Sequence, residues 1–332
     1  MKKLFGIAVA SATMITGAAS AGITKNMENP LFIPRAGQFA SKTGLGVMYK
    51  QADDTDAMKL KNHAGAVEFP VWRFTEDFSA GITDRLSAYL SLGYTYNDDI
   101  DRKGLHRGRI GLNYRIFETL NNFIWDMYGE AYLSGLSPMK GAVKLTSGKI
   151  DFKYDNFSNG RWGAVLGTRF GKTWSRFTAS AFVEFLQTFG NHNNQINTSA
   201  LPAAFGFPDE ISVDLKSTSE VTTGANAFYQ IDDAWSLGGG FRFVQHTDNG
   251  VRSIHTDVSS ANQTVVNNLL AETENMRDGW YEYILSASVA NQVTDSFQVA
   301  LVGEYTFDHA HQNSQNGTDA KLEVLLHLNF VF

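Results

Sequence analysis

The chain of 332 residues has no cysteine, few prolines and no run of 18 consecutive apolar residues. The absence of cysteine excludes a disulfide framework, so backbone hydrogen bonds and packing must hold the fold together. The absence of a long apolar run excludes a transmembrane helix.

The chain also lacks an excess of basic residues, and its formal net charge is −6. A nucleic-acid-binding protein would need a basic face, so nucleic acid is not an expected partner. There is no phosphate-binding glycine loop and no nucleotide fingerprint, and we expect no cofactor. Aromatic residues are abundant, at 13%, and glycine is frequent. This composition leaves two classes, a large soluble β-protein or a membrane β-barrel.

Short runs of alternating apolar and polar residues recur along the chain, which is typical of strands with two different faces. The last run, residues 322–332, carries apolar side chains at every second position up to Phe332. Counting back from it, we predict twelve strands, near 40–51, 66–82, 86–97, 105–117, 123–135, 159–171, 176–189, 217–231, 234–246, 279–292, 296–308 and 320–332. Residues 136–158 could form an additional hairpin or extend a strand, so ten or fourteen strands remain alternatives.

The connections between these strands are of two kinds. Residues 81–86, 230–235 and 291–297 form tight turns with Thr-Asp or Asp-Asp, where the Asp side chain is expected to hydrogen-bond its own backbone. Residues 190–216 and 247–278 are long and polar. Short turns that alternate with long loops are typical of an outer-membrane barrel, with the short turns in the periplasm.

One face of the strands carries no charge and is expected to point outward. It comprises Leu86, Ala88, Leu90, Leu92, Tyr94, Ile110, Leu112, Tyr114, Ile116, Trp235, Leu237, Phe241, Phe243, Tyr281, Tyr283, Leu285, Val289, Phe297, Val299, Leu301, Tyr305 and Phe307. Glu76 breaks the pattern, because it shares the outward parity of Trp72 and Phe78; a bulge or a place near the membrane edge would explain it. The opposite face is polar and charged, which a wet lumen tolerates and a dry core does not.

The start of the chain resembles a secretory signal peptide. Residues 1–21 have a basic start, a short apolar run and the small residues Ala19 and Ala21 before the expected cleavage site. Residues 22–35 hold two prolines and are expected to be extended, either in the periplasm or tucked into the lumen. Residues 36–332 would then form the barrel as a single domain.

The terminal strand, with Leu328, Phe330 and Phe332, resembles the C-terminal recognition signal of bacterial outer-membrane β-barrel proteins. The resemblance extends to the signal peptide and to the strand–turn rhythm of the whole chain. It implies an all-β, transmembrane, antiparallel up-and-down barrel in the outer membrane of a Gram-negative bacterium. It also implies three kinds of partner: outer-membrane lipid with lipopolysaccharide, the barrel-insertion machinery, and a small solute or ion.

Charges on the inward face are sorted by strand. The early strands are mostly basic and the later ones mostly acidic, and two such opposed arcs would orient a charged solute and bias ion selectivity. The candidate lumen residues are Arg73, Arg107, Arg109, Arg115, Asp126, Glu130, Glu184, Arg242, Glu282, Glu304 and Glu323. The alternative is that these charges pair and fill the lumen. Residues 264–276 have the spacing of a short amphipathic helix, which would constrict the mouth or lie on its rim.

Other chemistry is thinly represented. Residues 156–163, NFSNGRWG, resemble a motif of the outer-membrane phospholipase family, in which a histidine two residues before the serine acts as its base. Asn156 stands at that position and cannot activate Ser158, so we expect a turn and no enzyme. His309 and His311 lack further ligands nearby, and we expect no metal site. Two functions remain: a passive channel for small polar or charged solutes, or a non-conducting structural barrel that binds a partner through its long loops.

Overall fold

The computed structural model describes residues 26–51, 71–97, 102–119, 122–133, 140–146, 149–154, 161–190, 194–203, 208–247, 251–255, 280–310 and 319–332. The expected signal peptide with Ala19 and Ala21, the turn at Asn156 and Ser158, and the expected helix at 264–276 lie outside the described residues. Within the described part, no helix is long and apolar enough to cross a membrane.

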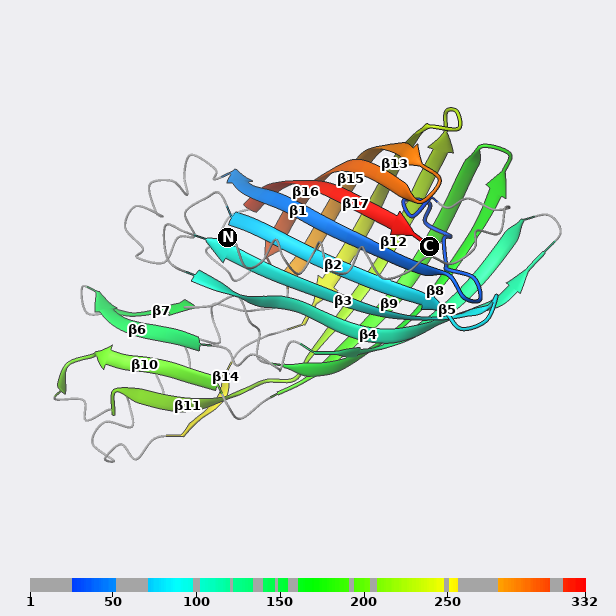
Figure 1. Cartoon of the computed structure of the whole chain (residues 1–332). Helices are drawn as coiled ribbons and strands as arrows, with labels where there is room; N and C mark the ends of the chain where they lie inside the picture. Colours follow the sequence, from blue (N-terminus) through cyan, green and yellow to red (C-terminus); the bar gives the residue numbers. More distant parts are fainter. Residues whose placement is uncertain are drawn as a thin grey trace.

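Twelve of the described strands form a closed barrel in which every neighbour is antiparallel (Figure 1). They are β1 (Phe39–Gln51), β2 (Val71–Gly81), β3 (Leu86–Asn97), β4 (Arg102–Glu118), β5 (Phe123–Tyr132), β8 (Trp162–Trp174), β9 (Phe177–Phe189), β12 (Thr218–Gln230), β13 (Trp235–His246), β15 (Trp280–Thr294), β16 (Phe297–Ala310) and β17 (Asp319–Val331). Their order around the barrel follows the chain, and β1 closes the cylinder against β17. The predicted fold class and the count of twelve are confirmed.

Five further strands form a separate sheet at the end of the barrel that carries the long connections (Figure 1). They are β6 (Lys140–Thr146), β7 (Lys149–Tyr154), β10 (Asn194–Ala200), β11 (Glu210–Leu215) and β14 (Val251–His255). The doubtful segment 136–158 therefore contains a hairpin that stands outside the barrel. Ile196, Ile211 and Val213 are buried in this sheet, so the long connections have an apolar core of their own.

The barrel strands have an apolar outer face and a polar inner face, as the alternation in the sequence predicts. Aromatic and aliphatic side chains such as Leu166, Leu301 and Tyr283 are exposed on the outside, although in a membrane this surface would meet lipid. At one position a bulge alters the register on which the expected outward direction of Ile116 was based. Ile116 falls in a bulge between Arg115 and Phe117, so Phe117 pairs with Trp125 and packs against its ring at 5.5 Å between centroids.

Rings gather toward the two ends of the strands. Near the short turns, Phe297 stacks on Phe330 at 4.7 Å between centroids, and Phe330 stacks on Phe332 at 6.1 Å. Near the long connections, Phe243 stacks on Tyr281 at 5.5 Å. Such belts suit the two interfaces of a bilayer, where an aromatic ring meets both headgroups and acyl chains.

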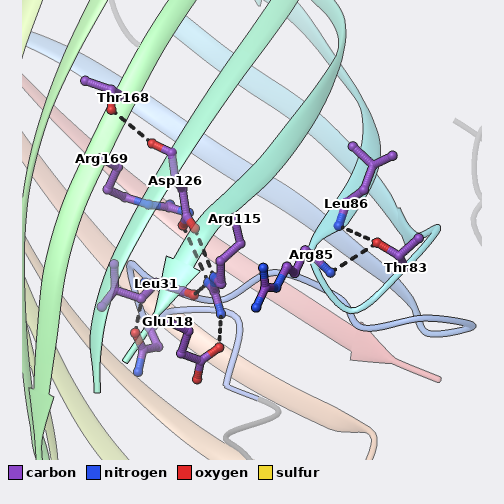
Figure 2. Close-up of polar contacts among 10 residues, drawn as sticks. Leu31, Thr83, Arg85, Leu86, Arg115, Glu118, Asp126, Thr168 and Arg169 are labelled. Carbon is purple, nitrogen blue, oxygen red and sulfur yellow. Dashed lines mark hydrogen bonds and ion pairs between the residues drawn. The ribbon is translucent and has the colours of Figure 1, made fainter. Parts of the chain in front are cut away.

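The tight turns use the expected side-chain hydrogen bonds, but often from a different residue. Asp232 Oδ1 accepts hydrogen bonds from the backbone N–H groups of Ala234 and Trp235 at 2.8 and 2.7 Å, as predicted. In the turn between β2 and β3, Thr83 Oγ1 takes this role and accepts from the N–H of Leu86 at 3.0 Å (Figure 2). A threonine hydroxyl thus replaces the expected aspartate there, because it reaches the same backbone donors.

The outward apolar face gives a test of the barrel's orientation toward lipid. Leu301 lies midway along β16 between Phe297 and Tyr305, and its side chain is 50% exposed. We expect Leu301→Arg to lower the free energy of unfolding in lipid vesicles by about 2–4 kcal/mol, because the charge would lie at the bilayer centre. Phe297→Arg, on the same face at the first residue of the strand, should cost less. Equal costs at both positions would contradict this depth dependence.

Candidate functional site: the barrel lumen

Asp126 on β5 is buried between two arginines. Arg115 on β4 and Arg169 on β8 lie directly opposite it on the neighbouring strands. The Arg115 Nε–H donates to Asp126 Oδ1 at 2.9 Å, and the Arg169 Nη2–H donates to Oδ2 at 2.7 Å (Figure 2). One carboxylate therefore neutralises part of two guanidinium charges, and the row joins three strands on the lumen side.

A second cluster centres on Arg109 of β4. Its Nη1 lies 3.2 Å from Oε2 of Glu130 on β5 and 3.0 Å from Oε1 of Glu184 on β9. The guanidinium also lies over the Tyr132 ring, 5.9 Å from its centroid. One cation here faces two carboxylates, the inverse of the arrangement around Asp126.

A tyrosine hydroxyl reaches this cluster by crossing one strand. Tyr89 on β3, Gly111 on β4 and Glu130 on β5 lie in one register row. The Tyr89 O–H donates a hydrogen bond to Glu130 Oε1. A Cβ at position 111 would lie 3.0 Å from the Tyr89 hydroxyl and 2.5 Å from the carbonyl oxygen of Gly129. Because position 111 is a glycine, the Tyr89 ring can lie against the backbone of β4 and reach Glu130.

The same arrangement recurs two strands further on. Tyr128 on β5, Gly167 on β8 and Glu184 on β9 form a register row, and the Tyr128 O–H donates to Glu184 Oε2 at 3.2 Å. A Cβ at position 167 would lie 2.1 Å from the Tyr128 ring, so only glycine lets the ring cross β8. Each Tyr–Gly–Glu row holds one carboxylate of the Arg109 cluster from the side.

Two further pairs line other parts of the wall. Arg73 on β2 reaches Glu323 on β17 at 2.6 Å, past β1, and Arg242 on β13 reaches Glu304 on β16 at 2.7 Å, past β15. The side chains of Arg242 and Glu304 keep 35% and 26% exposure on the inward face. This pair is therefore the part of the wall most open to water among those described here.

The predicted lumen residues with a described side chain lie on the inward face and have an opposite charge or a histidine within 3.7 Å. Glu282 lies 3.7 Å from Nε2 of His246. The side chain of Arg107 is outside the described residues, although its backbone pairs with Gly93. The sorting into two opposed arcs is not confirmed, because the charges meet as local pairs, and Arg242 pairs with Glu304 within the later strands.

The segment before β1 crosses the end of the barrel that carries the short turns; we call residues 26–38 the strap. Of the two alternatives for this segment, its contacts correspond to the one inside the lumen. Asn26 donates to Ser236 on β13 at 3.0 Å, and Asn29 donates to Thr178 on β9 at 3.3 Å. Leu31 offers its carbonyl to Arg115 on β4 at 2.7 Å (Figure 2). The strap is therefore fixed to strands on several sides of the mouth.

Glu28 is the most heavily bonded side chain of the strap. Its carboxylate lies 3.1 Å from Nζ of Lys42, accepts a hydrogen bond from Nδ2 of Asn329 at 2.9 Å and lies 3.2 Å from Nδ1 of His327. Burial opposes ionisation of Glu28, but the charge of Lys42 and the hydrogen bonds of His327 and Asn329 outweigh it and hold the pKa of the carboxyl well below its usual range.

A cavity of about 230 Å³ remains between the strap and the wall. Its lining combines apolar side chains of the strap and of β5 with polar and charged groups of the strap, β4, β8 and the turn before β5. The lining residues are Asn29, Leu31, Phe32, Ile33, Arg35, Gln38, Arg115, Glu118, Asn122, Ile124 and Thr173. The strap thus narrows the mouth most where it touches β1, β13 and β17 and leaves space on the opposite side.

Sequence reasoning missed both Tyr–Gly–Glu rows and the strap contacts. Tyr89 and Tyr128 have inward parity, which was a usable signal, but nothing in the sequence shows which glycine lies beside each ring. An apolar cluster of Tyr132, Val165 and Leu186, packed against Tyr128, was also missed on the inward face. No group of three or more potential metal ligands occurs in the described ranges.

The geometry can be compared with solved structures. The chain matches an outer-membrane channel from Pseudomonas putida F1 over 94% of this chain and 100% of that chain, with a TM-score of 0.53 and 11% identity. The chain has the fold of a bacterial outer-membrane channel.

Two other structures are more distant. The NanC porin matches over 87% of this chain and 98% of that chain, with a TM-score of 0.42 and 8% identity. The toluene transporter TodX from Pseudomonas putida matches over 94% of both chains, with the same TM-score and identity. Both likenesses are too remote to bear on the fold or the function. No protein-family model and no curated protein sequence matches the chain.

The second Tyr–Gly–Glu row can be tested through its glycine. We expect Gly167→Ala to displace the Tyr128 ring, break its hydrogen bond to Glu184 and lower the free energy of unfolding by about 1–3 kcal/mol. Gly303→Ala is the control, because no atom lies within 4 Å of a Cβ added at that strand position. Urea titration of the folded barrel, followed by tryptophan fluorescence, measures both. Equal stability of the two variants would show that the row contributes nothing.

Proposed function

We propose that the chain is a passive channel for small polar or charged solutes in a bacterial outer membrane. The supporting observation is the chemical contrast between the two faces of the closed wall: the outside is apolar, and the inside carries at least four ion-paired clusters. The partial exposure of Arg242 and Glu304 supports a lumen that holds water. The fold shared with an outer-membrane channel agrees with this function.

Paired charges on the wall favour the passage of polar solutes. A row of carboxylates and guanidinium groups offers donors and acceptors that replace the hydration of a polar solute, while the pairing keeps the local net charge small. A strongly charged wall of one sign would instead hold counter-ions tightly. We therefore infer moderate ion selectivity, set by the more exposed pairs and not by a field across the whole lumen.

The proposed path is narrowest where the strap crosses it. It lies in the mouth that we assign to the periplasm, since the short turns surround it and the long connections lie at the other end. The cavity beside Arg115 and Thr173 is the space left between the strap and the wall. Residues 1–21 would direct export, and Leu328, Phe330 and Phe332 would be read by the barrel-insertion machinery.

A second candidate function rests on the five-stranded sheet. Long connections that fold into a sheet with buried Ile196, Ile211 and Val213 can present a stable surface to a partner outside the cell. A non-conducting barrel would use this surface alone. Single-channel recordings in planar bilayers separate the two functions, because a channel gives discrete current steps and a closed barrel gives none at any voltage.

Selectivity should depend on the exposed pair. We expect Arg242→Gln to raise the cation preference of the channel and Glu304→Gln to lower it, because each leaves the other charge unpaired beside the aqueous path. Reversal potentials in a salt gradient measure both shifts. Val302→Ala, on the same face of β16 without a change of charge, is the control. Identical reversal potentials for all four proteins would remove this pair from the conduction path.

The strap should control conductance through Glu28. We expect Glu28→Gln to weaken the attachments to Lys42 and His327 and to raise the mean conductance. Since the pKa of Glu28 lies below its usual range, its contribution is present above the usual carboxyl pKa and is lost only as the pH falls through the lowered value. The wild-type strap should therefore stay attached from about pH 7 to about pH 5. Glu210→Gln, an exposed carboxylate on β11 away from the strap, is the control.

A further inference from the structure

A carboxyl group lies on the outer face of the barrel, in the middle of the apolar belt. Glu76 on β2 shares its parity with Trp72, Phe74 and Phe78, whose side chains are exposed on the outside. The sequence offered two explanations, a bulge or a place at the membrane edge. Both are wrong for this position.

The register excludes a bulge. β1 and β2 pair without a shift from Phe39↔Ala80 to Met48↔Val71, and Glu76 lies opposite Thr43. The depth excludes the membrane edge. Along β2, Glu76 lies four residues from Ala80, which pairs with Phe39, and four residues from Trp72. It is therefore midway between an aromatic side chain at each end of the strand pair.

Two hydroxyls on the adjacent strand bind this carboxyl. Ser41 Oγ–H donates to Oε1 of Glu76 at 2.8 Å, and Thr43 Oγ1–H donates to Oε2 at 2.7 Å. We call these three residues the outer polar patch. Apolar side chains surround it on β1 and β2 and on the flanking strands β3 and β17: Leu45, Phe74, Phe78, Leu90, Leu92, Leu326, Leu328 and Phe330.

The outer polar patch joins β1 to β2 but takes no part in the lumen. Strand alternation points Glu76 away from the lumen, so it cannot contact a solute inside. A carboxyl group surrounded by apolar side chains is neutral, so it keeps one O–H donor, and the hydroxyls of Ser41 and Thr43 fill only part of its acceptor positions. Acyl chains offer no donor, and ionisable residues that face hydrocarbon are costly. The patch therefore offers a donor and open acceptor positions to a polar group of another protein in the bilayer.

We propose that the outer polar patch is the centre of a two-fold interface between two copies of this barrel. The patch holds both hydroxyl donors and carboxyl acceptors, so it is complementary to itself, as an isologous contact requires. The neutral carboxyl of Glu76 in each copy can donate its O–H to a carboxyl oxygen of the other copy, which adds two hydrogen bonds and leaves those from Ser41 and Thr43 in place. The side chains at Ser41, Thr43 and Ala80 are small, which lets two walls approach closely.

Cross-linking tests the geometry directly, because the chain contains no cysteine. Leu45→Cys places a thiol beside the patch, on an exposed side chain of β1. Val183→Cys on β9 is the matched control, since its exposure is similar, 45% against 47%, and β9 lies across the barrel. With a short bis-maleimide in outer membranes, we expect a covalent dimer from Leu45→Cys and none from Val183→Cys. Equal yields, or no dimer from Leu45→Cys, would overturn the proposal.

Removal of the carboxyl tests the chemistry. In mild detergent and in lipid nanodiscs, we expect light scattering and native mass spectrometry to show a wild-type dimer. Glu76→Leu should weaken dimerisation by at least about tenfold, and Glu76→Gln, which keeps polar atoms at the position, should weaken it less. Conductance and heat-induced gel shift should be unchanged in both variants, which shows that the barrel is folded.

Three results would contradict the two-fold interface. One is a wild-type monomer at all concentrations, with or without bound lipid. Another is a dimer of Glu76→Leu as stable as the wild type. The last is a ring of three or more copies with no cross-link at Leu45→Cys, since that ring would join the patch to a different surface. None of these results depends on whether the lumen conducts.

Discussion

The pairing of β1 with β17 is the constraint on which the rest of the structure depends. Twelve register pairs, from Ala40↔Val331 to Gln51↔Ala320, join the two ends of the sheet and leave no free edge. In lipid, an open edge would leave backbone groups without partners, so the closed cylinder is the form in which these alternating strands can span a bilayer. Closure also decides which residues face one another, because it brings the basic side chain of Arg73 to the acidic strand β17.

Inside the cylinder, pairing organises charge at short range. Asp126 serves two arginines, while Arg109 serves two glutamates, and the two clusters share strands β4 and β5. Each cluster combines neighbouring strands, and the pair of Arg109 and Glu184 spans β5 and β8, so the ion pairs tie the wall laterally in the same direction as the backbone ladder. The lumen chemistry that we propose for solute passage therefore also stiffens the wall that carries it.

The sequence could predict the strands, their number and their faces, because a period of two is a strong signal over a dozen residues. It could not predict the partner of each charged residue. The partner of Arg109 depends on register, which the bulge before Phe117 and the glycines at 111 and 167 help to set. The five-stranded sheet was also beyond reach, because β6 and β10 pair in parallel from two separate connections. Glu76 was visible in the sequence, because it interrupts the alternation of apolar and polar residues. Its surroundings could be seen only in the structure.

The two Tyr–Gly–Glu rows have a consequence for the bore of the barrel. Each tyrosine ring lies flat along the wall over a glycine. At that level the ring therefore narrows the bore only by its thickness, whereas an extended side chain would narrow it by its full length. The diameter is then governed by the smallest residues of the wall. If Gly111 or Gly167 were replaced by a larger residue, the neighbouring tyrosine could no longer lie along the wall and would project into the bore.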